Sequence, residues 1–161
     1  MQPGPDDEIC DPACGTGGFF LSAYDHIVSN NKLDPDQRKH LRSDAFTGWE
    51  IVDNIARLCA MHVLLHGIES PESDSPIHVA DALLADPGDR FDMVLSNPPF
   101  GRKSSMTIVN EDGEVDEQAL TVVLPDNVLF EGGAGETIRR RLLHECDLHT
   151  ILRLPTGIFY A

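Results

Sequence analysis

Residues 91–101 join an apolar run to an amide, two prolines and an aromatic ring. The first five have the length and composition of a buried strand. Pro98 and Pro99 then end both strand and helix, because proline lacks a backbone N–H and fixes φ. The chain must therefore leave the sheet at Asn97, at the carboxyl end of a strand, where open α/β sheets bind their ligands.

The groups at this strand end suit an amino group on a flat base. The side-chain oxygen of Asn97 and the carbonyl of Pro98 accept hydrogen bonds, and the ring of Phe100 can stack on a base. The stretch predicts methyl transfer to an exocyclic amino nitrogen. The predicted catalytic residues are Asn97, Pro98, Pro99 and Phe100.

A glycine-rich turn at residues 11–18 stands between an expected strand and an expected helix. Glycines in this context let the backbone approach a ligand, which the free amides of the helix then face. The spacing is neither that of a dinucleotide site nor that of a triphosphate site. Asp11 at the first position favours a ligand with an amino or cationic group over a pyrophosphate. A turn selected only for packing is the alternative.

Two further acids close expected strands. Glu50 ends the strand at 45–50, where a carboxylate can accept both hydroxyls of a ribose, although a helix cap is the commoner role. Asp81 follows the strand at 77–79 and can accept from an adenine amino group. Together with Asp11, these acids predict a pocket for an adenosine that carries an amino-acid tail.

The elements that position these residues alternate along the chain. Strands are expected at 9–10, 45–50, 77–79, 91–95, 120–124 and 149–154, and helices at 19–28, 35–41, 51–65 and 137–143. This order predicts an α/β fold with a mostly parallel sheet and helices on both faces. Residues 101–117 are polar without an apolar period and predict an exposed or disordered loop.

The motifs at 11–20, 48–50, 81–82 and 97–101, in this order, resemble those of S-adenosylmethionine-dependent DNA adenine-N6 methyltransferases. Residues 123–132 and 154–159 resemble more specifically the modification subunit of type I restriction-modification systems. The resemblance covers nearly the whole chain. It implies a Rossmann-like catalytic domain over 1–161, in which 102–118 is a loop or disordered.

The resemblance also implies a cofactor, S-adenosyl-L-methionine, and a set of residues around it. The implied cofactor-binding residues are Asp11, Ala13, Gly15, Thr16, Gly17, Gly18, Glu50, Asp81 and Asn97. The turn would line the methionine part, Glu50 the ribose and Asp81 the adenine. The substrate adenine would be flipped out of duplex DNA and stacked on Phe100. No metal and no covalent enzyme intermediate is needed.

The chain of 161 residues has a formal net charge of −15 and a pI near 4.6. This balance argues against the domain gripping a phosphate backbone alone, because Lys and Arg dominate such binding. DNA is therefore expected to be held mainly through a separate specificity subunit, with a restriction subunit as a further partner. Solubility or a salty cytoplasm explains the charge equally well. Without a spanning segment or signal peptide, a cytoplasmic protein with no membrane partner is expected.

Four cysteines lack CxxC spacing: Cys10, Cys14, Cys59 and Cys146. Buried or inert thiols are expected rather than disulfides or a metal site. His62 and His66 lie one helical turn apart, but without an acidic partner nearby in sequence they are expected to be ordinary helix residues. The basic run at 139–141 is expected to be solvated or to pair with the acidic surface.

The sequence departs from the family pattern in three places. The family's helical amino-terminal region is missing, the helix between 101 and 120 is replaced by a polar loop, and the chain stops soon after the last motif. An incomplete catalytic domain is therefore expected. Two alternatives stay open: an amino-methyltransferase acting on protein glutamine or RNA, and a non-catalytic remnant that acts in complex assembly.

Overall fold

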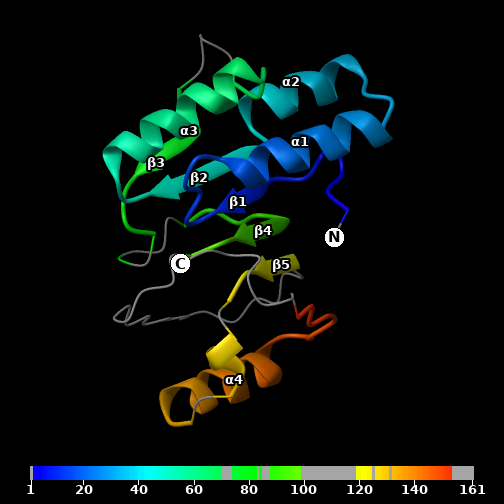
Figure 1. Ribbon diagram of the computed structural model, residues 1–161. Helices are drawn as coiled ribbons and strands as arrows, with labels where there is room; N and C mark the ends of the chain where they lie inside the picture. Colours follow the sequence, from blue (N-terminus) through cyan, green and yellow to red (C-terminus); the bar gives the residue numbers. More distant parts are fainter. Residues whose placement is uncertain are drawn as a thin grey trace. The chain divides into compact units, whose positions relative to one another are not determined.

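The computed structural model describes residues 2–69, 74–82, 84, 88–98, 119–124, 126–130 and 132–153. The chain forms two compact units, Met1–Val123 and Leu124–Ala161 (Figure 1). The first contains the sheet. In the part of the chain that the structure describes, no helix is long and apolar enough to cross a membrane.

The described residues of the first unit form a five-stranded parallel sheet with the order β3-β2-β1-β4-β5. The strands are β1 (Ile9–Asp11), β2 (Phe46–Glu50), β3 (Ile77–Val79), β4 (Met93–Ser96) and β5 (Ala119–Val122). In the register of the sheet, Ile9 lies between Phe46 and Met93. The strand order changes direction between β1 and β4, which is where folds of this class open a ligand crevice.

Three helices lie on the same side of this sheet: α1 (Gly18–Asn30), α2 (Pro35–Ser43) and α3 (Asp53–Leu65) (Figure 1). Right-handed crossovers from β1 to β2 and from β2 to β3 require this placement. Helix α2 begins with a capping box, in which Asp34 accepts from the Gln37 amide and the Gln37 side chain accepts from the Asp34 amide. Pro35 fits the first helical position because its missing N–H would have no partner there.

The core fills the space between these helices and the sheet. Phe20 of α1 meets Phe46 of β2 edge to face, with ring centroids 5.5 Å apart. Ile27 and Val63 are fully buried beside them. Each such side chain contributes roughly 1.5–3 kcal/mol on burial. This packing holds the strands in place and thereby fixes the positions of their carboxyl ends.

The second unit contains a 3-10 helix, η1 (Asp126–Leu129), and α4 (Ala134–Glu145). Arg140 and Arg141 pair with Glu136 and Glu145 of the same helix at 2.9 and 2.8 Å. These pairs are exposed, so each stabilises the helix by less than about 1 kcal/mol. The guanidinium of Arg139 donates to the carbonyl of Val128. The pairs of Arg140 and Arg141 with acidic side chains agree with the sequence expectation, whereas the bond of Arg139 to a backbone carbonyl was not foreseen.

The Rossmann-like, mostly parallel sheet is confirmed, and the first five expected strands and all four expected helices are present with ends shifted by a few residues. The sixth expected strand, at 149–154, is wrong: residues 149–153 have no strand structure. An apolar run becomes a strand only when it finds a backbone to pair with, and sequence composition does not supply that partner. The loop expected at 101–117 lies outside the described residues.

Candidate functional site

The carboxyl ends of β1, β2, β3 and β4 lie at one edge of the sheet because the strands are parallel. β1 is central, so Asp11 at its end lies between the strand that ends in Glu50 and the strand that leads to Asn97. Neighbouring strands are about 4.8 Å apart. The edge therefore brings together residues that are up to 86 positions apart in sequence.

The glycine turn after β1 is fixed to its surroundings by backbone hydrogen bonds. The amide of Cys14 donates to the carbonyl of Trp49 at 2.9 Å, and the amide of Gly17 donates to the carbonyl of Cys14 at 2.8 Å. Gly15 and Gly17 have φ values of +54° and +84°, a region that favours glycine. Gly18 is the first residue of α1. The turn is therefore followed directly by the amino end of α1.

Gly17 also packs closely on α3. A Cβ added at this position would lie 2.9 Å from the sulfur of Cys59, whereas one at Gly18 would meet nothing within 4 Å. We expect Gly17→Ala to lower the free energy of unfolding by about 2–4 kcal/mol, through left-handed strain and overpacking. Urea denaturation measures this change. Gly18→Ala is the matched control, and an equal loss in both variants would contradict the close contact.

Asp11 is buried, with 2% of its surface exposed. One carboxylate oxygen accepts from the amide of Ala13 at 3.0 Å. Burial raises the pKa of Asp11 to about 6, and the nearby charge of Glu50 adds to the rise, against the opposing effect of the Ala13 bond. Within the described residues, no Lys or Arg forms an ion pair with Asp11. A cationic ligand group would therefore meet a carboxylate that lacks a counter-ion there.

Glu50 and Asp81 lie at the same edge on the far side of β1 from Asn97. An oxygen of Glu50 accepts from the amide of Val52 at 2.8 Å, just before α3 begins. The bond is local, between residues two positions apart, and α3 has no side-chain cap hydrogen bond within the described residues, so the helix-cap role considered for Glu50 is not seen. Asp81 lies two residues beyond β3 and is partly buried, and its carbonyl accepts from the amide of Leu84.

Asn97 follows β4 directly, and its side chain is exposed rather than buried in the core. The ladder runs on to the preceding residue, since the carbonyl of Ser96 accepts from the amide of Val123 at 2.9 Å. Pro98 is partly buried. The chain thus leaves the sheet at the position expected from the proline pair. Pro99 and Phe100 lie outside the described residues.

The thiols differ in accessibility. Three are buried and Cys146 is exposed. Burial and the charge of Asp11 raise the pKa of Cys10 to about 12, and a hydrogen bond with Cys59, together with burial, raises the pKa of Cys14. The same hydrogen bond lowers the pKa of Cys59, but this residue is fully buried. Because a reagent must reach the thiol, we expect a disulfide reagent to label one thiol rapidly in the native chain and four after unfolding. Cys146→Ser should abolish the rapid phase, and a second rapid thiol would contradict the burial.

Two supports of the turn were missed by the sequence reasoning. His62, expected to be an ordinary helix residue, donates from Nδ1 to the carbonyl of Thr16 at 3.0 Å, and Cys59 packs under Gly17. Both lie on α3, more than 40 residues from the turn. No local pattern signals such contacts. Among the described residues, no group of three His, Cys, Asp or Glu side chains could hold a metal ion.

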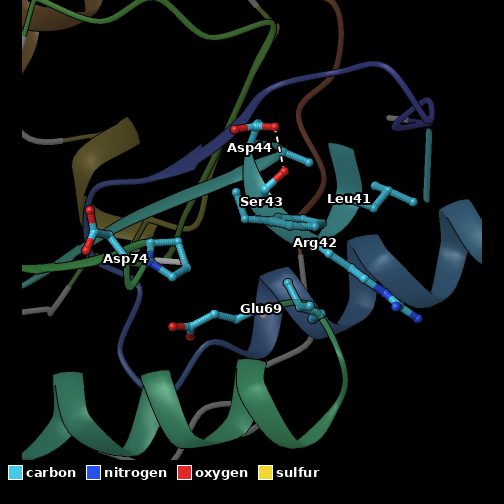
Figure 2. Close-up of a pocket in the computed structure, with 10 residues that line it drawn as sticks. Leu41, Arg42, Ser43, Asp44, Glu69 and Asp74 are labelled. Atoms are coloured by element: carbon cyan, nitrogen blue, oxygen red, sulfur yellow. Dashed lines mark hydrogen bonds between the residues drawn. The ribbon is translucent and has the colours of Figure 1, made fainter. Parts of the chain in front are cut away.

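A pocket of polar character lies elsewhere, where α2 leads into β2 (Figure 2). Asp44, Glu69 and Asp74 line it, and the hydroxyl of Ser43 donates to Asp44 at 2.6 Å. Phe46, the first residue of β2, also lines it. The pocket is therefore at the amino edge of the sheet, opposite the edge that carries Asp11 and Asn97.

Comparisons with known proteins agree with this geometry. The model of the family described as N-6 DNA Methylase matches residues 1–120 and 115–161. The chain is 38% identical, over 187 aligned residues, to the type I restriction enzyme StySPI methylase subunit of Salmonella potsdam, and 37% identical to the EcoKI methylase subunit of Escherichia coli. In both cases the match covers 100% of this chain and 35% of the relative, so the chain spans about a third of their length.

Solved structures give the same result. The crystal structure of the EcoKI M protein matches with a TM-score of 0.82 and 37% identity, covering 99% of this chain and 38% of that one. A modification subunit of a putative type I restriction enzyme from Vibrio vulnificus matches with a TM-score of 0.69 and 28% identity, covering 89% and 35%. The resemblance seen in the motifs is confirmed, and the chain belongs to the N-6 DNA methylase family.

Proposed function

We propose that this chain carries the cofactor and catalytic sites for methylation of the N6 amino group of adenine in DNA, as part of a type I modification subunit. The observation that carries the proposal is the position of the Asp11 turn and of Asn97 on the neighbouring strands β1 and β4. They flank the point where the strand order reverses. The names of the relatives support the same reaction class.

The residues at the sheet edge fit S-adenosyl-L-methionine. Asp11 is a buried carboxylate without a described counter-ion, which suits the ammonium group of the methionine part. Between Ala13 and Gly18 the side chains are small or absent, so a ligand can come close to the backbone of the turn. A carboxylate oxygen of Glu50 would accept from the ribose hydroxyls, and the carboxylate of Asp81 would accept from the adenine amino group. When bound, the cofactor supplies an electrophilic methyl group on a sulfonium.

The chain's own part in the reaction is to hold the adenine amino group. The oxygen of Asn97 and the carbonyl of Pro98 would accept the two N6 hydrogens, which draws the nitrogen from its planar, conjugated state toward one with an available lone pair. Phe100 would stack on the flipped base, and Pro99 would keep the backbone from continuing as a strand or helix. Catalysis then rests on positioning and on acceptors matched to charge that develops on N6.

The net charge of −15 favours DNA binding by a separate subunit over DNA binding by this chain alone. DNA would be held mainly by a separate, more basic specificity subunit, and a restriction subunit would be a further partner in the assembly. This role places the protein in the cytoplasm. Residues 1–161 would form one catalytic region, in which 102–118 would be a loop or disordered.

Labelled methyl transfer to unmethylated DNA, with and without a specificity subunit, tests the proposal. We expect label on adenine N6 when the specificity subunit is present. Label on protein or RNA alone would favour the other methyltransferase classes. Cofactor binding without transfer under every condition would indicate a non-catalytic remnant, and either result would overturn the proposal.

A further inference from the structure

We propose that His62 is a positioning residue for the cofactor turn, an inference that rests on the proposed function. Its Nδ1 lies 3.0 Å from the carbonyl oxygen of Thr16, which is 46 positions earlier in the chain. A carbonyl oxygen can only accept, so Nδ1 carries the proton in this bond. The contact joins α3 to the loop that would face the methionine part of the cofactor.

This bond fixes one peptide unit from both sides. The carbonyl of Thr16 and the amide of Gly17 belong to the same planar peptide. The carbonyl is held by His62, and the amide donates to the carbonyl of Cys14 at 2.8 Å. The oxygen and the hydrogen of the peptide therefore both have defined partners, which sets the direction in which the plane faces.

The peptide needs such a restraint because one of the two residues that it joins is a glycine. The plane turns through ψ of Thr16 and φ of Gly17, and Gly17, with positive φ and no Cβ, resists this rotation less than another residue would. Without the His62 bond, the peptide plane could rotate, and the Thr16 carbonyl would no longer have a fixed direction relative to the bound ligand. Cys59, one helical turn before His62, packs under Gly17 and keeps α3 close to the loop.

The side chain of His62 is exposed, so its bond contributes little to the free energy of unfolding. Its effect should therefore appear in the cofactor affinity rather than in the global stability. This separates a positioning role from a merely structural one. His66, the C-cap residue that directly follows α3, is also exposed and makes no hydrogen bond to the turn within the described residues, so it serves as the matched control.

The test compares His62→Leu, His62→Asn and His66→Leu in this 161-residue chain by calorimetric titration with S-adenosyl-L-methionine. His62→Leu should weaken binding by about threefold to tenfold, the range that one neutral hydrogen bond supplies. Its unfolding midpoint should stay near that of the wild type. His62→Asn should restore affinity, because the amide nitrogen of Asn lies near the place of Nδ1. Equal affinities of His62→Leu and His66→Leu would overturn the inference.

Amide hydrogen exchange at Gly17 keeps the inference separate from the proposed function. If the wild-type chain binds no cofactor, the proposed function fails for this chain, but the exchange rate can still be measured without ligand. His62→Leu should then exchange faster at Gly17 than His66→Leu, with similar rates in the helices. Equal rates at Gly17 would overturn the role of His62 in either case.

Discussion

Asn97→Ala is expected to lower methyl transfer to DNA by about 100-fold or more and to leave the affinity for S-adenosyl-L-methionine nearly unchanged. Asn97 is exposed at the end of β4, where its oxygen can accept from an amino group of a substrate base. Removal of one preorganised hydrogen-bonding group that acts on developing charge costs about 10² to 10³ in rate. Single-turnover transfer of labelled methyl to DNA, with the specificity subunit present, measures the loss.

Asn54→Ala is the matched control for this prediction. Asn54 is an exposed residue in the first turn of α3, four positions after Glu50, and it is not one of the proposed site residues. It should transfer methyl groups at the wild-type rate. Turnover by Asn97→Ala that matches Asn54→Ala would remove Asn97 from the reaction, and loss of cofactor affinity in Asn97→Ala alone would assign it to cofactor binding instead.

Asp11→Asn is expected to stabilise the fold while it weakens cofactor binding. The pKa of Asp11 rises from 3.8 to about 6 in the folded chain, chiefly through burial and also through the charge of Glu50. The folded state therefore favours the protonated form. Because 1.36 kcal/mol corresponds to one pKa unit, the ionised side chain costs up to about 3 kcal/mol near neutral pH, which the neutral Asn would not.

The sign of the pH dependence follows from this shift. Between about pH 4 and pH 6 the folded chain binds more protons at Asp11 than the unfolded chain does, so the contribution of Asp11 to stability is complete below pH 4 and is lost as the pH rises through 6. Urea denaturation across this range should show the loss in the wild type and its absence in Asp11→Asn. The same slope in both proteins would contradict a raised pKa.

The cofactor affinity should change in the opposite direction. A hydrogen bond to a charged group contributes about 1.5–3 kcal/mol, so loss of the carboxylate should weaken binding by about tenfold to a hundredfold. Asp25→Asn removes the same charge from an exposed site on α1 and should change neither property appreciably. Unchanged affinity in Asp11→Asn would separate the buried acid from the ligand.

The fold could be predicted wherever the signal was local. Short apolar runs located β1, β4 and β5 before a proline and β2 and β3 at or just before an acid, and Pro35 marked the start of α2. The strand expected at 149–154 failed because pairing is a tertiary property, and residues 149–153 have no strand structure. Apolar residues there are exposed, for example Leu152 at 78%. Composition gave the apolar character but could not supply a neighbouring backbone.

The candidate site also combines features that have a local sequence signal with features that depend on tertiary packing. The acids at strand ends and the glycine turn were visible in sequence because they mark where strands end. The bond between His62 and Thr16 was not visible, since it spans 46 positions and depends on how α3 packs beside the turn. The raised pKa of Asp11 was equally hidden, because it arises from burial and from Glu50 on a neighbouring strand.

Mapping of backbone amide chemical shifts during titration with S-adenosyl-L-methionine tests the central claim most directly. We predict saturable changes centred on Gly15, Gly17 and Glu50, with smaller changes near Asn97. Changes centred instead on the pocket around Asp44 and Glu69, at the amino edge of the sheet, would contradict the assignment of the site, as would no change at saturating cofactor.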